Sequence, residues 1–154
     1  MLGIPDELTV RSQWVCWRYE QRGGKPTKVP IDARTGASAK TNDSSTWSSY
    51  EEALAGVTRH KCDGLGFVFT REDPYVGIDL DHCIDEMGAL GRKAREIVAV
   101  FSTYTELSPS GKGLHCILRG SVPSGATNSA VLNGQAVEVY GEGRYFCMTG
   151  EVWS

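Results

Sequence analysis

Asp79 and Asp81 are the residues whose type and spacing most directly suggest chemistry. They alternate with apolar residues in the stretch 76–81 (Val-Gly-Ile-Asp-Leu-Asp), and a period of two is typical of a strand with one buried face. Both carboxylates would project from one face, about 6.6 Å apart along the strand. Parallel carboxylates repel each other unless a cation lies between them, so the pair suits one or two hard divalent ions. Taken alone, an acidic strand face exposed to solvent explains the pattern equally well.

A second candidate site is the loop 108–113 (Ser-Pro-Ser-Gly-Lys-Gly), which separates two expected strands and is followed by His115. Its serines and glycines, Ser110 and Gly111 among them, favour a loop whose backbone amides converge on an anion. Lys112 adds a positive charge, and His115 can donate a hydrogen bond to a phosphate oxygen. The alternative for this stretch is an ordinary hairpin turn with a structural histidine.

Glu138 is a third candidate, because it stands between Val137 and Val139 on an expected strand and so projects from the opposite face. It could supply another carboxylate to a metal site, or simply face solvent. Arg144 follows a glycine-rich turn, from which it could bind a phosphate with two hydrogen bonds. A solvated turn residue is the alternative there.

The elements that would position these residues are mostly strands. We expect them at residues 14–20, 28–31, 64–70, 76–81, 104–108, 114–118, 136–140 and 145–149. A capping box formed by Ser48 and Glu51 predicts one helix, with a buried face made by Tyr50, Ala53, Leu54 and Val57. Apolar spacings of three, four and seven from Ala94 to Phe101 predict another. Residues 32–46 and 121–135 are predicted to be loops. The fold class is therefore α+β, with a mixed or antiparallel sheet.

Composition limits the classes of protein. The chain has 154 residues, 40% of them hydrophobic and 23% charged, which suits one compact domain or two small lobes and favours neither disorder nor a membrane span. Five scattered cysteines without a Cys-x-x-Cys pair predict neither a disulfide framework nor a zinc site, and most are expected in the core. Net charge is −3, but residues 1–40 hold seven Lys/Arg against four Asp/Glu, so a polyanion should meet that segment.

The order of the three candidate sites is more specific than any one of them. Asp-x-Asp on a strand, then small-x-His at 113–115, then a lone acid on a strand resembles the archaeo-eukaryotic primase superfamily, especially its phage and plasmid primase-polymerases. The resemblance covers nearly the whole chain. It is carried by residues 64–68, 78–82, 108–115, 138–140, 143–146 and 149–150, together with 13–15, 28–30 and Trp47.

This resemblance implies a primase-polymerase fold in which an N-terminal α/β lobe packs on a lobe with an RNA-recognition-motif-like sheet, with the active site in the cleft. It implies that the catalytic carboxylates hold two divalent ions, magnesium or manganese; these are Asp79, Asp81 and Glu138. The implied nucleotide-binding residues are Ser110, Gly111, Lys112 and His115, with Arg144 and Lys28 as further triphosphate or template contacts. His82 is interpreted as structural.

The resemblance also implies that residues 1–154 form a single catalytic domain, the N-terminal part of a longer replication protein of a phage, plasmid or other mobile element. Its partners would be single-stranded or primed DNA, deoxynucleoside or ribonucleoside triphosphates, and a fused or associated helical domain and helicase, with no membrane. We expect it in the cytoplasm of a bacterium or phage-infected cell. Because relatives usually continue into a helical segment, we expect this chain to extend primers but to start strands poorly.

The function implied is template-dependent nucleotidyl transfer, as in a DNA polymerase or primase. One alternative is a non-catalytic domain that binds single-stranded nucleic acid on an RNA-recognition-like sheet. Such sheets use exposed aromatic residues where this chain places Asp79, Asp81 and Glu138. A second alternative, a rolling-circle nicking enzyme, needs two adjacent histidines and a tyrosine nucleophile, whereas His82 and His115 stand apart.

Overall fold

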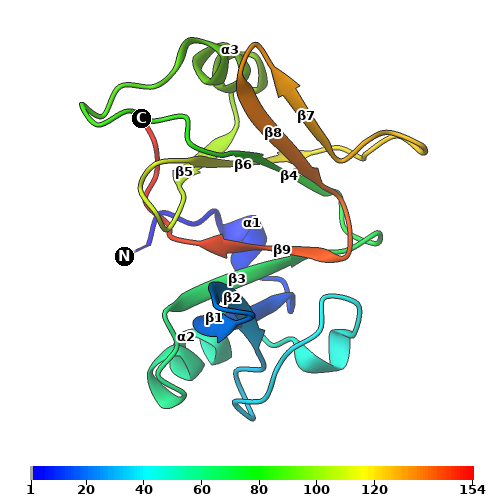
Figure 1. Cartoon of the computed structure of the whole chain (residues 1–154). Helices are drawn as coiled ribbons and strands as arrows, with labels where there is room; N and C mark the ends of the chain where they lie inside the picture. Colours follow the sequence, from blue (N-terminus) through cyan, green and yellow to red (C-terminus); the bar gives the residue numbers. More distant parts are fainter. Residues whose placement is uncertain (1) are drawn as a thin grey trace. The chain divides into compact units, whose positions relative to one another are not determined.

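The computed structural model describes residues 2–154, which form two compact units. The first contains residues 69–144 together with the short segments up to residue 3 and from 149 to 154. The second contains residues 4–68 and 145–148. The α+β prediction is confirmed, and each unit is built on its own sheet (Figure 1).

The first unit is a five-stranded antiparallel sheet in the order β5-β6-β4-β8-β7. Its strands are β4 (Tyr75–Leu80), β5 (Tyr104–Leu107), β6 (Leu114–Arg119), β7 (Ser129–Leu132) and β8 (Gln135–Tyr140). The strand that carries Asp79 is therefore central and pairs with β6 on one side and β8 on the other. Because β4 is hydrogen-bonded to a strand on each side, its backbone is held in place, and so are the positions from which its side chains project.

One face of this sheet is covered by α3 (Arg92–Phe101), as Figure 1 shows. Ile78 and Leu80 of β4 lie in a buried cluster, and Ile97 and Val98 of the helix pack against it. Since side chains alternate along a strand, Asp79 must project from the opposite face. The predicted buried positions of Ile78 and Leu80 and the outward position of Asp79 are thus confirmed, as is the second helix. The strand was predicted to reach residue 81 but ends at Leu80, so Asp81 lies in the turn that follows it.

The second unit is a four-stranded sheet in the order β2-β1-β3-β9. Its elements are α1 (Asp6–Thr9), β1 (Trp14–Arg22), β2 (Lys25–Ile31), η1 (Ser44–Thr46), α2 (Tyr50–Arg59), β3 (Gly64–Phe69) and β9 (Arg144–Met148). Strand β2, which contains Pro26 and Pro30, lies at the edge of the sheet, where proline is tolerated because it has no backbone N–H to donate to a second neighbouring strand. All five cysteines are free and four are buried.

Three local predictions were wrong. The cap of α2 is Ser49, whose hydroxyl accepts from the amide of Glu52, whereas Ser48 exchanges backbone hydrogen bonds with Trp14. Leu54 is 41% exposed, so the buried face of α2 does not include it. Residues 129–132 form the edge strand β7 instead of a loop. All four of its residues are exposed, so no buried face marks this strand in the sequence.

Among the described residues, no helix is long and apolar enough to span a membrane.

Candidate active site

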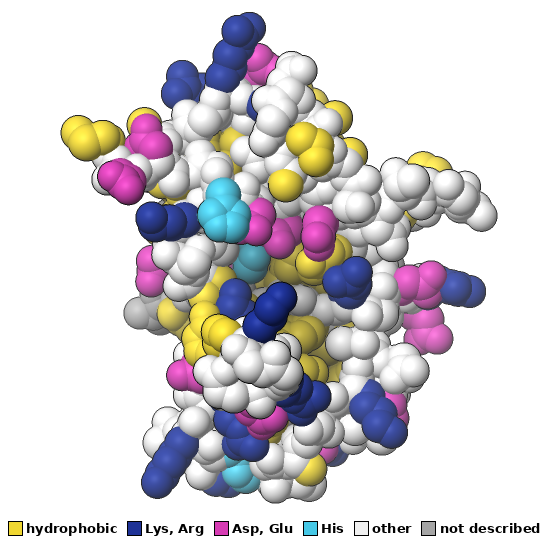
Figure 2. All heavy atoms as spheres, in the orientation of Figure 1, with side chains coloured by type: hydrophobic (Ala, Val, Ile, Leu, Met, Phe, Trp, Pro, Cys, Tyr) yellow, Lys and Arg dark blue, Asp and Glu magenta, His cyan; other side chains and the backbone are white. Residues whose placement is uncertain are grey.

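Four polar side chains form a row across the sheet of the first unit. Register places Asp79 opposite Glu138 of β8 and opposite His115 of β6, and His115 is in turn opposite Glu106 of β5. Residues directly opposite each other project from the same face of a sheet. The row therefore reads Glu138, Asp79, His115, Glu106, on the face that α3 does not cover. Figure 2 shows acidic and histidine side chains gathered in one region of the surface.

His115 lies between two carboxylates. Its Nε2 is 3.7 Å from Oδ1 of Asp79, and its Nδ1 is 3.5 Å from Oε1 of Glu106. The imidazole is buried, while the Asp79 side chain keeps about a quarter of its surface exposed (25%). A ligand that reached Asp79 would therefore meet the Nε2 edge of His115 rather than its Nδ1 edge.

Asp81 follows the end of β4 and is exposed. Its backbone oxygen accepts a hydrogen bond of 2.8 Å from the side chain of the buried Gln135. His82, which was interpreted as structural, is 82% exposed, and its Nδ1 lies 3.1 Å from Oδ2 of Asp81. The histidine thus contacts a candidate metal ligand at the surface instead of filling the core.

The loop 108–113 lies against the end of β4. A Cβ atom added at Gly113 would be 2.9 Å from the backbone oxygen of Leu80, so only glycine allows this close approach. Gly111 has a backbone φ angle of +71°, a conformation that residues other than glycine rarely adopt. A Cβ atom at Gly113 would also lie 3.6 Å from the Cα of Asp81, so the loop backbone passes beside this residue, and Ser110 and Lys112 are exposed on the loop.

The prediction that the backbone amides of this loop converge on an anion is wrong for residues 111–113. The amide of Gly111 donates to the oxygen of Ser108 at 2.8 Å, and the amides of Lys112 and Gly113 donate to serine hydroxyls at 3.2 and 3.1 Å. These groups stabilise the loop itself. The candidate phosphate contacts in the loop are consequently side chains: the Ser110 hydroxyl and the Lys112 ammonium group.

Glu138 is connected to Arg144 through an aromatic ring. The hydroxyl of Tyr140 donates to Oε2 of Glu138 at 2.7 Å, and the Arg144 guanidinium lies 5.0 Å from the centre of the Tyr140 ring. Burial and this hydrogen bond raise the pKa of the Tyr140 hydroxyl above its ordinary value. Tyr140 therefore remains a hydrogen-bond donor to Glu138 at neutral pH.

The donor set suits a hard divalent cation. Asp79, Asp81 and Glu138 offer carboxylate oxygens, the ligands that magnesium and manganese prefer. Among the described residues, no three His, Cys, Asp or Glu side chains are grouped closely enough to bind a metal ion as placed. Asp79 and Glu138 are nevertheless cross-strand partners, so a cation bound to both would relieve their repulsion.

The sequence analysis did not predict two hydrogen-bonded pairs of a tyrosine and a glutamate. Tyr104 donates to Glu106 at 2.7 Å just as Tyr140 donates to Glu138, and in each pair the two residues lie two apart on one strand. The signal in the sequence is this Tyr-x-Glu or Glu-x-Tyr spacing, which puts both side chains on one face.

Lys28 belongs to the second unit, where its Nζ lies 5.8 Å from the centre of the Trp17 ring, and its role stays a prediction.

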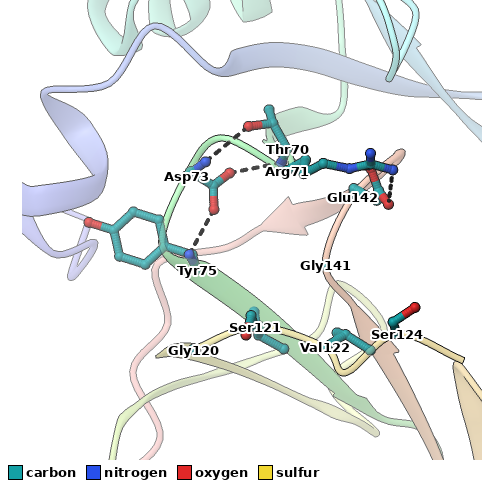
Figure 3. A pocket seen from close by; sticks show the side chains of 11 residues that line it. Thr70, Arg71, Asp73, Tyr75, Gly120, Ser121, Val122, Ser124, Gly141 and Glu142 are labelled. Atoms are coloured by element: carbon teal, nitrogen blue, oxygen red, sulfur yellow. Dashed lines mark hydrogen bonds and ion pairs between the residues drawn. The ribbon is translucent and has the colours of Figure 1, made fainter. Parts of the chain in front are cut away.

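A pocket of about 410 Å³ lies at the other end of β4, where Tyr75 and Val76 begin the strand (Figure 3). Arg71 and Glu142 line it and form an ion pair of 3.0 Å, which Figure 3 shows. None of the candidate catalytic residues lines this pocket. We therefore place the candidate site on the row and the loop, because the chemistry of their side chains is more specific than the presence of a hollow.

The chain is similar to phage primase-polymerases, as its motifs indicated. A DNA primase-polymerase of Nitratiruptor phage NrS-1 is 41% identical to it over 148 residues, which make up 95% of this chain and 20% of the relative. The chain therefore spans about a fifth of the length of that relative. No family model matches the chain.

Proposed function

We propose that this chain catalyses template-dependent nucleotidyl transfer, as a DNA polymerase or primase domain in the replication of a phage or other mobile element. The observation that carries the proposal is the row Glu138, Asp79, His115, with Asp81 and the loop 108–113 beside it. Carboxylates and phosphate-binding side chains at one place suit a nucleoside triphosphate with its divalent ions. The similarity to a phage DNA primase-polymerase supports the same activity.

In this reaction, the 3′ oxygen of a primer forms a bond to the α-phosphorus of a nucleoside triphosphate. The bond from that phosphorus to its bridging oxygen breaks, and pyrophosphate leaves. Two divalent ions, magnesium or manganese, would lower the pKa of the attacking hydroxyl and neutralise charge on the leaving group.

The residues of the chain would have separate tasks. Asp79, Asp81 and Glu138 would hold the ions, and Tyr140 would keep Glu138 in place through its hydrogen bond. The Nε2 edge of His115 and the side chain of Lys112 would bind the triphosphate. Charge-assisted hydrogen bonds of this kind contribute roughly 1.5–3 kcal/mol each.

Ser110, Gly111, Arg144 and Lys28 complete the proposal. The Ser110 hydroxyl would contact a phosphate, and Gly111 would shape the loop that presents it. Arg144, with its guanidinium beside Tyr140, would contact either the triphosphate or the template. Lys28 would contact the template as part of the basic segment 1–40.

A primer-extension assay tests the proposal. The chain is incubated with a primed DNA template, manganese and either deoxynucleoside or ribonucleoside triphosphates, and products are separated on a denaturing gel. We expect template-directed extension with at least one class of triphosphate, and loss of extension with a chelator. A protein that binds single-stranded DNA without extending any primer would instead be the non-catalytic binding domain.

A further inference from the structure

Glu106 is a buried acid for which the proposed function has no task. It lies on β5 with none of its surface exposed (0%), directly opposite His115. It therefore extends the row of polar side chains by one strand beyond the histidine. A fully buried carboxyl group is costly unless it is hydrogen-bonded, so its contacts show what holds it there.

Both oxygens of Glu106 accept hydrogen bonds. Oε1 accepts from the amide of Thr149 at 3.0 Å, and Oε2 accepts from the amide of Gly150 at 2.8 Å and from the Tyr104 hydroxyl at 2.7 Å. Two of the three donors are backbone groups, whose positions are set by the chain. The place of the Glu106 side chain is consequently fixed by groups other than His115.

This fixed acceptor faces one nitrogen of the imidazole. Oε1 lies 3.5 Å from Nδ1 of His115, while Nε2 is directed toward Asp79 on the other side. An acceptor beside one ring nitrogen favours the proton on that nitrogen and limits rotation of the ring. Glu106 can therefore determine which edge of the imidazole is presented to the candidate active site.

We propose that Glu106 is a positioning residue that acts through His115: it keeps a proton on Nδ1 and orients the ring so that Nε2 faces Asp79 and the bound nucleotide. The part that concerns the nucleotide rests on the proposed function. The competing explanation is a purely structural role, in which Glu106 anchors the backbone at Thr149 and Gly150 and has no effect on the imidazole.

The first test measures the ring nitrogens of His115 by ¹H–¹⁵N nuclear magnetic resonance, without metal or nucleotide. The chain has three histidines, so His115→Asn assigns the signals of this ring by their loss. In the wild type we expect a protonated Nδ1. In Glu106→Gln the amide oxygen should take the place of Oε2, which accepts two hydrogen bonds, so that the NH2 group, a donor, faces Nδ1. We therefore expect protonation to shift from Nδ1 toward Nε2, with the signals of His60 and His82 unchanged. An unchanged His115 pattern in folded Glu106→Gln overturns the proposal.

Tyr104→Phe is the matched control for this measurement. It removes the hydroxyl that donates to Oε2 and leaves the carboxyl group of Glu106 in place. We expect the His115 ring to keep its proton on Nδ1. If Tyr104→Phe and Glu106→Gln change the ring signals equally, general disturbance of β5 explains them and the proposal is wrong. The readout does not depend on catalysis, so it stands apart from any failure of the proposed function.

The second test is a double-mutant cycle on primer extension. We expect Glu106→Gln to lower kcat/KM about 10- to 100-fold, the range typical of groups that orient a ligating or catalytic histidine. In the His115→Asn background the same change should have almost no effect, because the ring on which Glu106 acts is gone. An equal loss in both backgrounds would show a structural anchor only. Glu106→Asp, which keeps an acidic acceptor, should recover part of the activity and serves if Glu106→Gln does not fold.

Discussion

Asp79 and Glu138 lie directly opposite each other on the neighbouring strands β4 and β8. Cross-strand partners have Cβ atoms about 4.5–5.5 Å apart, and like charges in such pairs destabilise a sheet. The protein therefore keeps an unfavourable pair near the centre of its five-stranded sheet. A divalent cation bound to both carboxylates would turn this repulsion into stabilisation.

Manganese should raise the melting temperature of the wild type and not that of Asp79→Asn. At an ion concentration about a hundredfold above Kd, binding to the folded state stabilises it by roughly 2.7 kcal/mol, or roughly 5–10 °C for a chain of this size. Without metal, Asp79→Asn should be slightly more stable than the wild type, because the repulsion with Glu138 is removed. Thermal melts with and without manganese measure both effects.

Glu72→Gln is the control for that experiment. Glu72 is an exposed acid that precedes β4, at the end of the strand away from Asp79, and its loss changes the net charge by the same amount. Its melting temperature should respond to manganese as the wild type does. A full metal-dependent shift in Asp79→Asn would contradict the assignment of Asp79 as a ligand.

Asp79→Ala and Asp81→Ala should each abolish nucleotide incorporation while the fold is kept. Loss of a carboxylate ligand removes several kcal/mol of transition-state stabilisation, which corresponds to about a thousandfold or more in rate. Glu138→Ala should follow the same direction with a smaller loss, since water can replace one ligand more easily. Single-turnover primer extension measures the rates, and circular dichroism checks the fold. A folded double mutant with near wild-type extension would remove both residues from the site.

The alternation of polar and apolar residues made most of the sheet of the first unit predictable. Ile78 and Leu80 are buried because α3 covers their face, and that alternation alone placed Asp79 on the other face. Strand β7 was not predictable in this way, because its residues are exposed on both faces and carry no alternation of burial. Local pattern therefore identifies a strand only where the fold buries one of its faces.

Register explains why Glu106 was missed and Asp79 was not. Asp79 stands between Ile78 and Leu80, so its outward face follows from the strand period alone. Glu106 meets His115 only because β5 pairs with β6 in one register, and a shift of one residue would reverse its face. The same limit applies to the loop 108–113, where the choice of Ser108 and Ser110 as acceptors for the amides depends on loop geometry.

His115→Ala and Lys112→Ala should weaken nucleotide binding more than template binding. Each removes one charge-assisted hydrogen bond to the triphosphate, worth roughly 1.5–3 kcal/mol, so the Kd for nucleotide should rise about 10- to 150-fold. Fluorescence titrations with labelled nucleotide and with labelled DNA separate the two effects. Arg92→Ala, which removes an exposed charge from α3, is the control and should change neither. Lost DNA affinity with unchanged nucleotide affinity would place the loop on the template.

Gly113→Ala should reduce both stability and extension. The added Cβ would lie 2.9 Å from the backbone oxygen of Leu80, so the loop must move away from the end of β4 at a cost of about 1–3 kcal/mol. Displacement of the loop would also move Gly113, and with it the preceding Lys112, away from the end of β4. Gly120→Ala is the matched control, because nothing lies within 4 Å of a Cβ atom there. Equal melting temperatures and rates for the two variants would contradict the close approach.

Extension of a primer should be much faster than the start of a new strand when this chain acts alone. Among residues 2–154 we assign one triphosphate site, the side chains of the loop 108–113 with His115. Extension needs only that site, since the primer duplex brings the attacking hydroxyl and is itself held by phosphate contacts. Initiation must order two free nucleotides on a template, and each ordering event costs free energy that further contacts would have to offset. The excess of basic residues in 1–40 is modest, so template binding should be weak and should weaken further with salt. The measurement compares primed and unprimed templates of one sequence, with manganese and both classes of triphosphate, on a gel that resolves dinucleotides. Dinucleotide synthesis at a rate close to that of extension would show that residues 1–154 hold two nucleotides without help from another domain.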